Sequence, residues 1–121
     1  MGKLDNKVAI ITGGSGGIGQ AAARLFTSEG AKVMLVDLNE DKLAGIAHSI
    51  GEDKCAYMAA DVTDADQAKA YIAKTVEHFG GVDVTLLNAG IEGKIALIPD
   101  QDEADFDKVI AVNVRGVWLG M

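Results

Sequence analysis

Cysteine, proline and aromatic side chains are scarce in this sequence of 121 residues. Cys55 is the only cysteine, which excludes an intrachain disulfide and a cysteine-based metal cluster. His48 and His78 are the only histidines, and they lie on different predicted helices without the spacing of a metal site. We therefore expect surface positions for both histidines and no bound metal.

Long apolar runs and clustered positive charge are also missing. No run approaches the roughly 18 apolar residues that a helix needs to span a bilayer, and the first six residues lack the apolar core of a secretory signal. Eleven Lys and Arg stand against eighteen Asp and Glu, a net charge of −7, whereas nucleic-acid binding needs clustered positive charge. We expect a soluble, cytoplasmic protein with neither a membrane nor a nucleic-acid partner.

Glycine, in contrast, is abundant: there are 15 glycines, placed without a repeat, in a chain whose 49% apolar content is ordinary for a globular protein. The length fits one domain, and no linker or charge block divides it. Four short apolar runs predict β-strands buried on both faces, at 8–11, 33–36, 56–59 and 82–87. The third run is the weakest and is assigned mainly from its place in the series.

The segments between these strands have the apolar spacing of helices. Their predicted core-facing residues are Ile18, Ala21, Ala22, Leu25 and Phe26; then Leu43, Ile46, Ala47 and Ile50; then Ala65, Ala68, Ile72, Val76 and Phe79. Asn39 is the predicted N-cap of the second helix, and Thr63 with Asp66 resembles a capping box for the third. Regular alternation of strands and helices indicates βαβ units, hence an α/β fold with a parallel sheet.

The last predicted helix is apolar on two faces. One face carries Phe106, Val109, Ile110 and Val117, and the other carries Ala111, Val114, Trp118 and Met121. No other part of the sequence is an obvious cover for the second face. The sequence stops at Met121 without a helix-ending Gly, Asn or Pro, so we expect that the chain is cut inside a helix.

A glycine-rich string follows the first strand directly and runs from Thr12 to Gly19. Glycine allows backbone to approach a ligand closely, and the N-terminus of the following helix presents free N–H groups to an anion such as a pyrophosphate. Asp37 ends the second strand, 20 residues beyond Gly17, where an acid that binds ribose hydroxyls is expected. The alternatives are a plain glycine-rich turn and a loop carboxylate.

Asp37 also bears on the choice of dinucleotide. A carboxylate at this position repels the 2′-phosphate of NADP, and the glycine string contains no Lys or Arg to offset it. The sequence therefore favours NAD as the cofactor.

These residues resemble the short-chain dehydrogenase/reductase family, in its single-domain form, along the whole chain. The resemblance implies a Rossmann-type doubly wound sheet with strand order 3-2-1-4, truncated before a fifth strand, so that residues 1–121 form an incomplete dinucleotide-binding domain. Four ordered motifs carry it: the glycine string, an acidic–apolar pair, Asn-Ala-Gly, and a helical segment with Asn113. The predicted cofactor-binding residues are Thr12, Gly13, Ser15, Gly17, Ile18, Gly19, Asp37, Leu38, Asp61, Val62, Asn88, Ala89 and Gly90.

Two asparagines have different predicted roles. Asn113 lies on the apolar stripe of its own helix, where a polar side chain costs stability unless it is hydrogen-bonded. By the resemblance it is a catalytic residue that helps to hold a water of the proton relay, and the alternative is a buried Asn that satisfies a neighbouring backbone group. Asn88 is interpreted as structural, tying the end of the fourth strand near the cofactor. Leu87 departs from the family's usual Asn at that position.

The family's catalytic Tyr-x-x-x-Lys pair and its preceding Ser are absent from these 121 residues. Neither Tyr57 nor Tyr71 has a Lys four residues on, and Tyr71 is expected on the solvated side of its helix. The resemblance implies the cofactor-binding part of an NAD-dependent oxidoreductase acting on a secondary alcohol or ketone, homo-oligomeric, and inactive as this segment alone. The alternative is a non-catalytic dinucleotide-binding or assembly module.

Overall fold

Four parallel strands form one sheet in a computed structural model that describes residues 2–121. The strands are β1 (Val8–Thr12), β2 (Lys32–Asp37), β3 (Cys55–Ala59) and β4 (Val84–Leu87). They lie in the order β3-β2-β1-β4, and Ile10 on β1 stands between Met34 on β2 and Thr85 on β4. The predicted strand order is confirmed, although the fourth strand begins two residues later than its apolar run.

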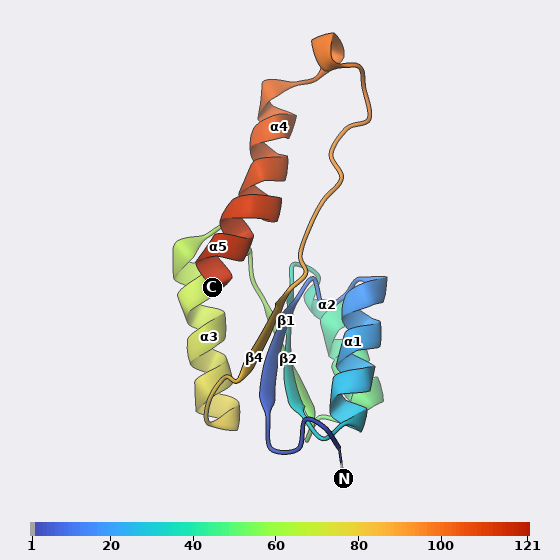
Figure 1. Ribbon diagram of the computed structural model, residues 1–121, viewed down its shortest axis with the longest axis vertical. Helices are drawn as coiled ribbons and strands as arrows, with labels where there is room; N and C mark the ends of the chain where they lie inside the picture. The colour runs from blue at the N-terminus through green and yellow to red at the C-terminus, as the bar shows by residue number, and fades with distance from the viewer. Residues whose placement is uncertain (1) are drawn as a thin grey trace.

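Helices cover both faces of this sheet (Figure 1). On one face lie α1 (Gly17–Ser28) and α2 (Glu40–Ile50), and on the other lie α3 (Ala65–Phe79) and α5 (Gly116–Gly120). A long connection after β4 contains the short 3-10 helix η1 (Ile98–Asp100) and leads to α4 (Glu103–Ile110), which extends beyond the sheet in Figure 1. Between α4 and α5 the helix widens into the π-helical stretch η2 (Ala111–Arg115).

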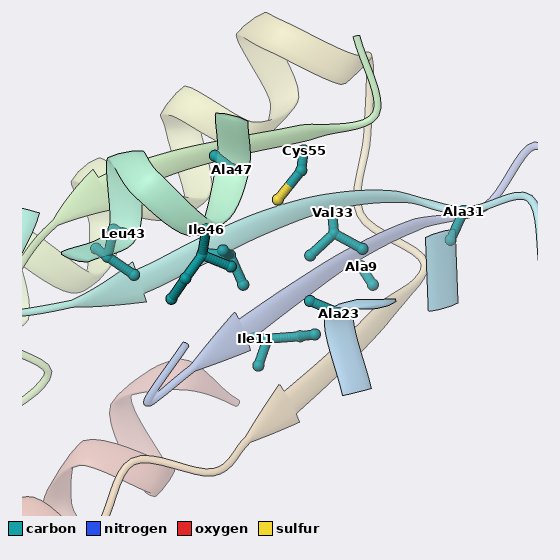
Figure 2. Packing of buried hydrophobic residues seen from close by; sticks show 10 residues of the cluster. Ala9, Ile11, Ala23, Ala31, Val33, Leu43, Ile46, Ala47 and Cys55 are labelled. Atoms are coloured by element: carbon teal, nitrogen blue, oxygen red, sulfur yellow. The ribbon is translucent and has the colours of Figure 1, made fainter. Parts of the chain in front are cut away.

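The core consists of two apolar layers, one on each face of the sheet. On the face covered by α1 and α2, Ile11 and Val33 of the sheet and Leu43 of α2 are fully buried, and Figure 2 shows how they pack with Ala23 and Cys55. The other layer joins Ile10, Met34 and Val36 to α3 and the last helical turns. Because both faces of β1 and β2 are covered, these strands are apolar at nearly every position, as their sequence indicated.

The helix spacing predicted the helices correctly, and part of each predicted face packs on the core, for example Ala22 and Phe26 of α1 and Ala68, Ile72 and Phe79 of α3. Single positions in α1 and α3 differ from the prediction. In α1 the buried residues are Gly19, Ala23 and Thr27, whereas Ile18 and Leu25 are exposed, because small residues let this helix approach the sheet closely. In α3 the prediction that Tyr71 faces solvent is wrong. Tyr71 is 1% exposed, and its hydroxyl is buried without a hydrogen-bond partner among the described residues.

Side chains cap the starts of α2, α3 and α4. Asn39 caps α2 as predicted, since its side chain accepts a hydrogen bond from the Lys42 amide at 3.1 Å. The capping box at Thr63 is not formed: Asp64 is the N-cap of α3 and accepts from the amides of Asp66 and Gln67. Thr63 is instead engaged with a carboxylate of the cavity described below.

Apolar side chains stand exposed on the last helical segments. Phe106, Ile110, Val114, Trp118 and Met121 are 41–89% exposed. The outer edge of β4 is unpaired within the described residues, where β4 hydrogen-bonds only to β1. In residues 2–121 no helix has the length and apolar character needed to cross a membrane.

Candidate dinucleotide-binding site

A cavity of about 490 Å³ opens at the carboxyl ends of the strands. The turns after all four strands contribute to it, and α4 and η2 close it with Lys108 and Val112. In open α/β sheets, ligands bind at this edge, in the crevice where the strand order reverses. Here the order reverses between β1 and β4, so the cavity lies where the topology predicts a ligand site.

Most of the predicted binding residues meet in this cavity. Its walls include Gly13, Ser15, Gly17, Ile18, Asp37, Leu38, Asp61, Val62, Asn88, Ala89 and Gly90. Three predicted site residues do not line the cavity: Thr12, Gly19 and Asn113. They contact residues that do line it, namely Ala89, Gly13 and Ile91 respectively. The prediction missed Gly16, Lys42, Ala60, Ile91, Lys108 and Val112, which also line the cavity.

The glycine loop after β1 is shaped by close backbone contacts. Gly13 has φ +67°, and its carbonyl accepts a hydrogen bond from the amide of Gly16 at 3.1 Å. A Cβ on Gly19 would lie 2.3 Å from the Gly13 carbonyl oxygen, so only glycine lets α1 pack against the loop. The first turn of α1 carries no acidic side chain, and its unpaired amides lie beside the cavity-lining Gly16 and Gly17.

Asp37 is fastened to this loop. One carboxylate oxygen accepts hydrogen bonds from the Ser15 amide at 3.1 Å and from the Ser15 hydroxyl at 2.5 Å, and the other accepts from the Leu38 amide at 2.8 Å. The half-buried carboxylate therefore stands at a fixed place on the wall of the cavity. Ser15 and Asp37 are 22 residues apart in sequence, so the fold itself brings them together.

Asp61 and Val62 form the wall beyond β3. The Thr63 hydroxyl and amide donate to the Asp61 carboxylate at 2.6 and 2.9 Å, and these bonds hold the pKa of Asp61 below its ordinary value. Val62 is 8% exposed and packs against Gly116, where a Cβ would lie 2.9 Å from a Val62 methyl group. The pair thus offers an ionised carboxylate beside a fixed apolar surface.

Asn88 and Thr12 tie the end of β4 to the glycine loop. The Asn88 side-chain amide donates to the Gly13 carbonyl at 3.4 Å, and the Thr12 hydroxyl accepts from the Ala89 amide at 3.1 Å. Thr12 is 2% exposed, so it acts from behind the cavity wall. The geometry agrees with the structural interpretation of Asn88.

Asn113 lies on η2 and pairs with the backbone of a single residue. Its side-chain oxygen accepts from the Ile91 amide, and its side-chain nitrogen donates to the Ile91 carbonyl, both at 2.8 Å. The prediction that it lies on a buried apolar stripe is wrong, because its side chain is exposed. The side of the helix that packs on the sheet carries Val112, Gly116, Leu119 and Gly120 instead.

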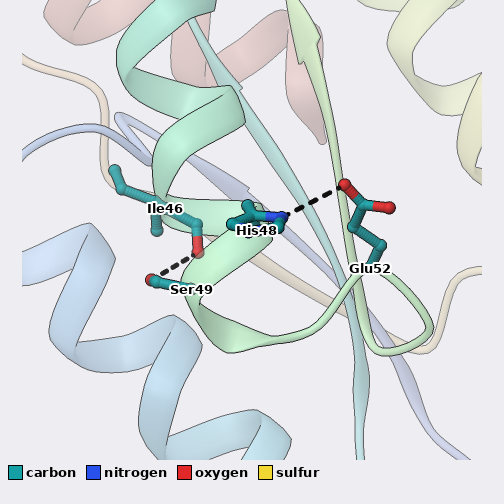
Figure 3. Close-up of polar contacts among 4 residues, drawn as sticks. All are labelled: Ile46, His48, Ser49 and Glu52. Atoms are coloured by element: carbon teal, nitrogen blue, oxygen red, sulfur yellow. Dashed lines mark hydrogen bonds and ion pairs between the residues drawn. The ribbon is translucent and has the colours of Figure 1, made fainter.

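The histidines lie away from this cavity. His48, near the end of α2, is exposed, and its ring Nδ1 lies 3.5 Å from a Glu52 carboxylate oxygen four residues on, next to the Ser49 hydroxyl that donates to the Ile46 carbonyl (Figure 3). His78 is also exposed. Among residues 2–121 no cluster of His, Cys, Asp or Glu is arranged to hold a metal ion.

Comparisons with known proteins agree with one another. A family model described as short chain dehydrogenase matches residues 7–121. The chain is 47% identical over 114 residues to short-chain dehydrogenase reductase 5 of Arabidopsis thaliana, covering 94% of this chain and 44% of that protein.

Solved structures give the same result. A 3-ketoacyl-(acyl-carrier-protein) reductase from Brucella melitensis, complexed with NADH, superposes with a TM-score of 0.94 at 36% identity, over 98% of this chain and 48% of that one. An NAD+-bound xylitol dehydrogenase superposes with a TM-score of 0.93 at 31% identity, over 98% of this chain and 46% of that one. The chain therefore spans less than half the length of these relatives.

Proposed function

The chain belongs to the short-chain dehydrogenase family, and from that premise we propose that it is the NAD(H)-binding part of an oxidoreductase acting on a secondary alcohol or ketone. Residues 1–121 would then be the dinucleotide-binding domain of a longer protein. The observation that carries the proposal is the fixed arrangement of the glycine loop and Asp37 on one cavity.

The residues fit a dinucleotide along the length of the cavity. The amides at the start of α1 suit a pyrophosphate, because Gly16 and Gly17 leave the backbone uncovered. Asp37 is an acceptor for ribose hydroxyls, and Asp61 with Val62 offers an acceptor and an apolar surface for the adenine. Two relatives of similar structure carry NADH or NAD+ in their crystals.

We propose NAD rather than NADP as the cofactor. The Asp37 carboxylate lines the cavity and, in the proposed binding mode, would lie beside the 2′-phosphate of NADP. Like charges about 4 Å apart repel by roughly 1 kcal/mol per unit pair even in water. Position 16 of the loop is glycine and offers no compensating cation. Lys42 and Lys108 also line the cavity. The proposal requires that their attraction for a 2′-phosphate is weaker than its repulsion by Asp37.

The bound nicotinamide would supply the hydride chemistry, and the protein would bind and orient it. We also propose that Asn113 is a catalytic residue that helps to hold a water of the proton relay. Because both polar atoms of its side chain are bonded to Ile91, its side chain acts first by fixing that residue beside the cavity. The proton donor and its lysine would come from residues outside the 121 of this chain.

A second candidate is a non-catalytic dinucleotide-binding or assembly module formed by this segment alone. It is favoured by one observation, that no Tyr-x-x-x-Lys pair occurs in the sequence. The two candidates differ in the gene: an open reading frame that continues into a Ser followed by Tyr-x-x-x-Lys supports the enzyme. A gene that ends at the codon for Met121 supports the module.

The apolar side chains exposed on α4 and α5 support homo-oligomeric assembly as a further part of the proposal. The cytoplasmic location stays a prediction from the sequence.

Calorimetric titration of the chain with NADH tests the binding proposal. We expect saturable binding at one site. The Gly19→Ala variant should lose it, because the added Cβ would overlap the Gly13 carbonyl. Gly45→Ala is the matched control, since a Cβ on Gly45 of α2 meets nothing within 4 Å. A parent chain that does not bind NADH, or a Gly19→Ala variant that binds as well as Gly45→Ala, contradicts the proposal.

A further inference from the structure

The segment after the Asn88–Gly90 turn is hydrogen-bonded at one end to η2 and at the other end to α4. At one end Asn113 holds both backbone polar groups of Ile91. At the other end the Asp105 carboxylate accepts a hydrogen bond from the Lys94 amide at 2.9 Å. We call residues 91–94 the strap.

Between these two anchors the strap lies directly on the helix. Gly93 has φ +80°, and a Cβ built on it would lie 2.7 Å from a Val109 methyl carbon and 3.1 Å from the Asp105 carboxylate. Asp105, Val109 and Asn113 are four residues apart, so they occupy one face of the helix. Three successive turns of that face thus contact the strap, at Lys94, Gly93 and Ile91 in turn.

The strap matters because it continues the wall of the cavity. Gly90 and Ile91 line the cavity from one side, and Lys108 and Val112 line it from the helix that carries both anchors. A Cβ on Gly90 would lie 3.3 Å from the Asn113 side-chain oxygen, so the wall and the helix are already in contact. The separation of the two walls is therefore set by the anchors.

Of the two anchors, Asn113 belongs to one of the four motifs of the sequence, whereas Asp105 belongs to none of them. Beyond Lys94 the connection is largely exposed: Ile95, Leu97 and Ile98 are 76–86% exposed. The next side-chain bond in the connection is local, from the Gln101 side chain to the Ala96 carbonyl, and does not reach the helix. Loss of the Asp105 bond would leave Ile91 as the last hydrogen-bonded tie between the strap and α4–η2.

We propose that Asp105 is a positioning residue which, through the Lys94 amide and Gly93, holds Gly90 and Ile91 in place for the dinucleotide. The inference rests on the proposed function, because it takes the cavity as the NAD(H) site. Asp105 acts on the ligand only through the strap and does not touch the ligand itself.

A simpler role for Asp105 is its charge. It lies in the first turn of α4, where a carboxylate stabilises the helix dipole, and Glu103 lies in the same turn. Glu103 has no side-chain hydrogen bond among those of the described residues. Glu103→Ala therefore removes the same charge from the same turn while leaving the strap intact, and it serves as the matched control.

The test measures amide hydrogen exchange of the chain by NMR and, in parallel, its NADH affinity. In Asp105→Ala we expect exchange at Lys94 and Ile91 to speed up by about tenfold, and the Kd for NADH to rise about threefold to tenfold, as for the loss of one hydrogen bond. Asp105→Asn keeps an acceptor oxygen for the Lys94 amide. It should stay within about twofold of the parent in both measurements, as should Glu103→Ala.

Two outcomes overturn the inference: Asp105→Ala keeps parent-like exchange at Ile91 and parent-like affinity, or Glu103→Ala loses as much as Asp105→Ala. If Asp105→Ala does not fold, Gly93→Ala opens the same contact from the strap side, and parent-like behaviour of that variant overturns the inference instead. A parent chain that binds no NADH refutes the proposed function, and the exchange rates then decide whether Asp105 holds the strap.

Discussion

Asp37→Ala is the substitution that tests the cofactor assignment most sharply. In the folded chain the Asp37 carboxylate accepts from the Ser15 amide, the Ser15 hydroxyl and the Leu38 amide, and it lines the cavity. The remaining acceptor capacity would be offered to the ribose hydroxyls. Removing the side chain deletes that acceptor and also frees Ser15 from the wall.

A hydrogen bond to a charged acceptor contributes roughly 1.5–3 kcal/mol, and the lower end applies because Asp37 is only half-buried. We expect the Kd for NADH to rise by about tenfold or more. Binding of NADPH should weaken less or improve, because the repulsion of its 2′-phosphate is removed together with the carboxylate. The preference for NADH over NADPH should therefore narrow.

Fluorescence titration of the chain with NADH and NADPH measures this directly. Asp41→Ala is the control, because it removes an equal charge from the exposed first turn of α2, at a residue that does not line the cavity. The reasoning is refuted if the parent prefers NADPH, or if Asp37→Ala and Asp41→Ala have the same affinities and the same preference.

Three further predictions concern charge, chemistry and assembly. Because the pKa of Asp61 is lowered, the contribution of its carboxylate to stability is complete above the ordinary carboxyl pKa of about 3.9 and is lost as the pH falls through the lowered value. In an NMR titration, Thr63→Val should raise the pKa of Asp61. An unchanged pKa would refute the role of the Thr63 hydroxyl. The 121-residue chain should leave NADH absorbance unchanged with a panel of ketones, since it lacks the Tyr-x-x-x-Lys pair; turnover that survives repurification would overturn this. Because β4 has an unpaired edge within the described residues and Trp118 is 68% exposed, light scattering should show a dimer or larger species. A monodisperse monomer with a cooperative melt would contradict this prediction of self-association.

The sequence was sufficient for the order of helices and strands along the chain, because buried parallel strands and capped amphipathic helices have strong local patterns. The order of the strands in the sheet was predicted from the resemblance to the short-chain dehydrogenase/reductase family. It failed where tertiary packing decides. Spacing alone placed Ile18 toward the core, but α1 buries its small residues instead and leaves Ile18 exposed beside the cavity. It also placed Tyr71 in solvent, although α3 turns that side chain inward.

The same limit applies to the cavity. The glycine loop and Asp37 could be predicted because each follows a strand at a recognisable spacing, and the Asp61–Val62 pair was predicted from the family resemblance. Lys108 and Val112 could not, since they enter the cavity only through the placement of α4 and η2. The sequence indicates only that Lys108 and Val112, four residues apart, lie on the same face of a helix. It does not indicate that this face borders the cavity. The bond between Asp105 and Lys94 depends on a loop path that no local pattern specifies.

The central claim is that the cavity formed by the glycine loop and Asp37 binds NAD(H), and amide chemical-shift mapping of the chain with NADH tests it most directly. The account predicts saturable shifts at Gly13–Gly19, Asp37–Leu38, Asp61–Val62 and Asn88–Ile91. A second cavity lies along β3, where Cys55–Ala59 and His78 are among its lining residues, and their resonances should stay unchanged. Saturable shifts confined to the β3 cavity, or none at the glycine loop, would contradict it.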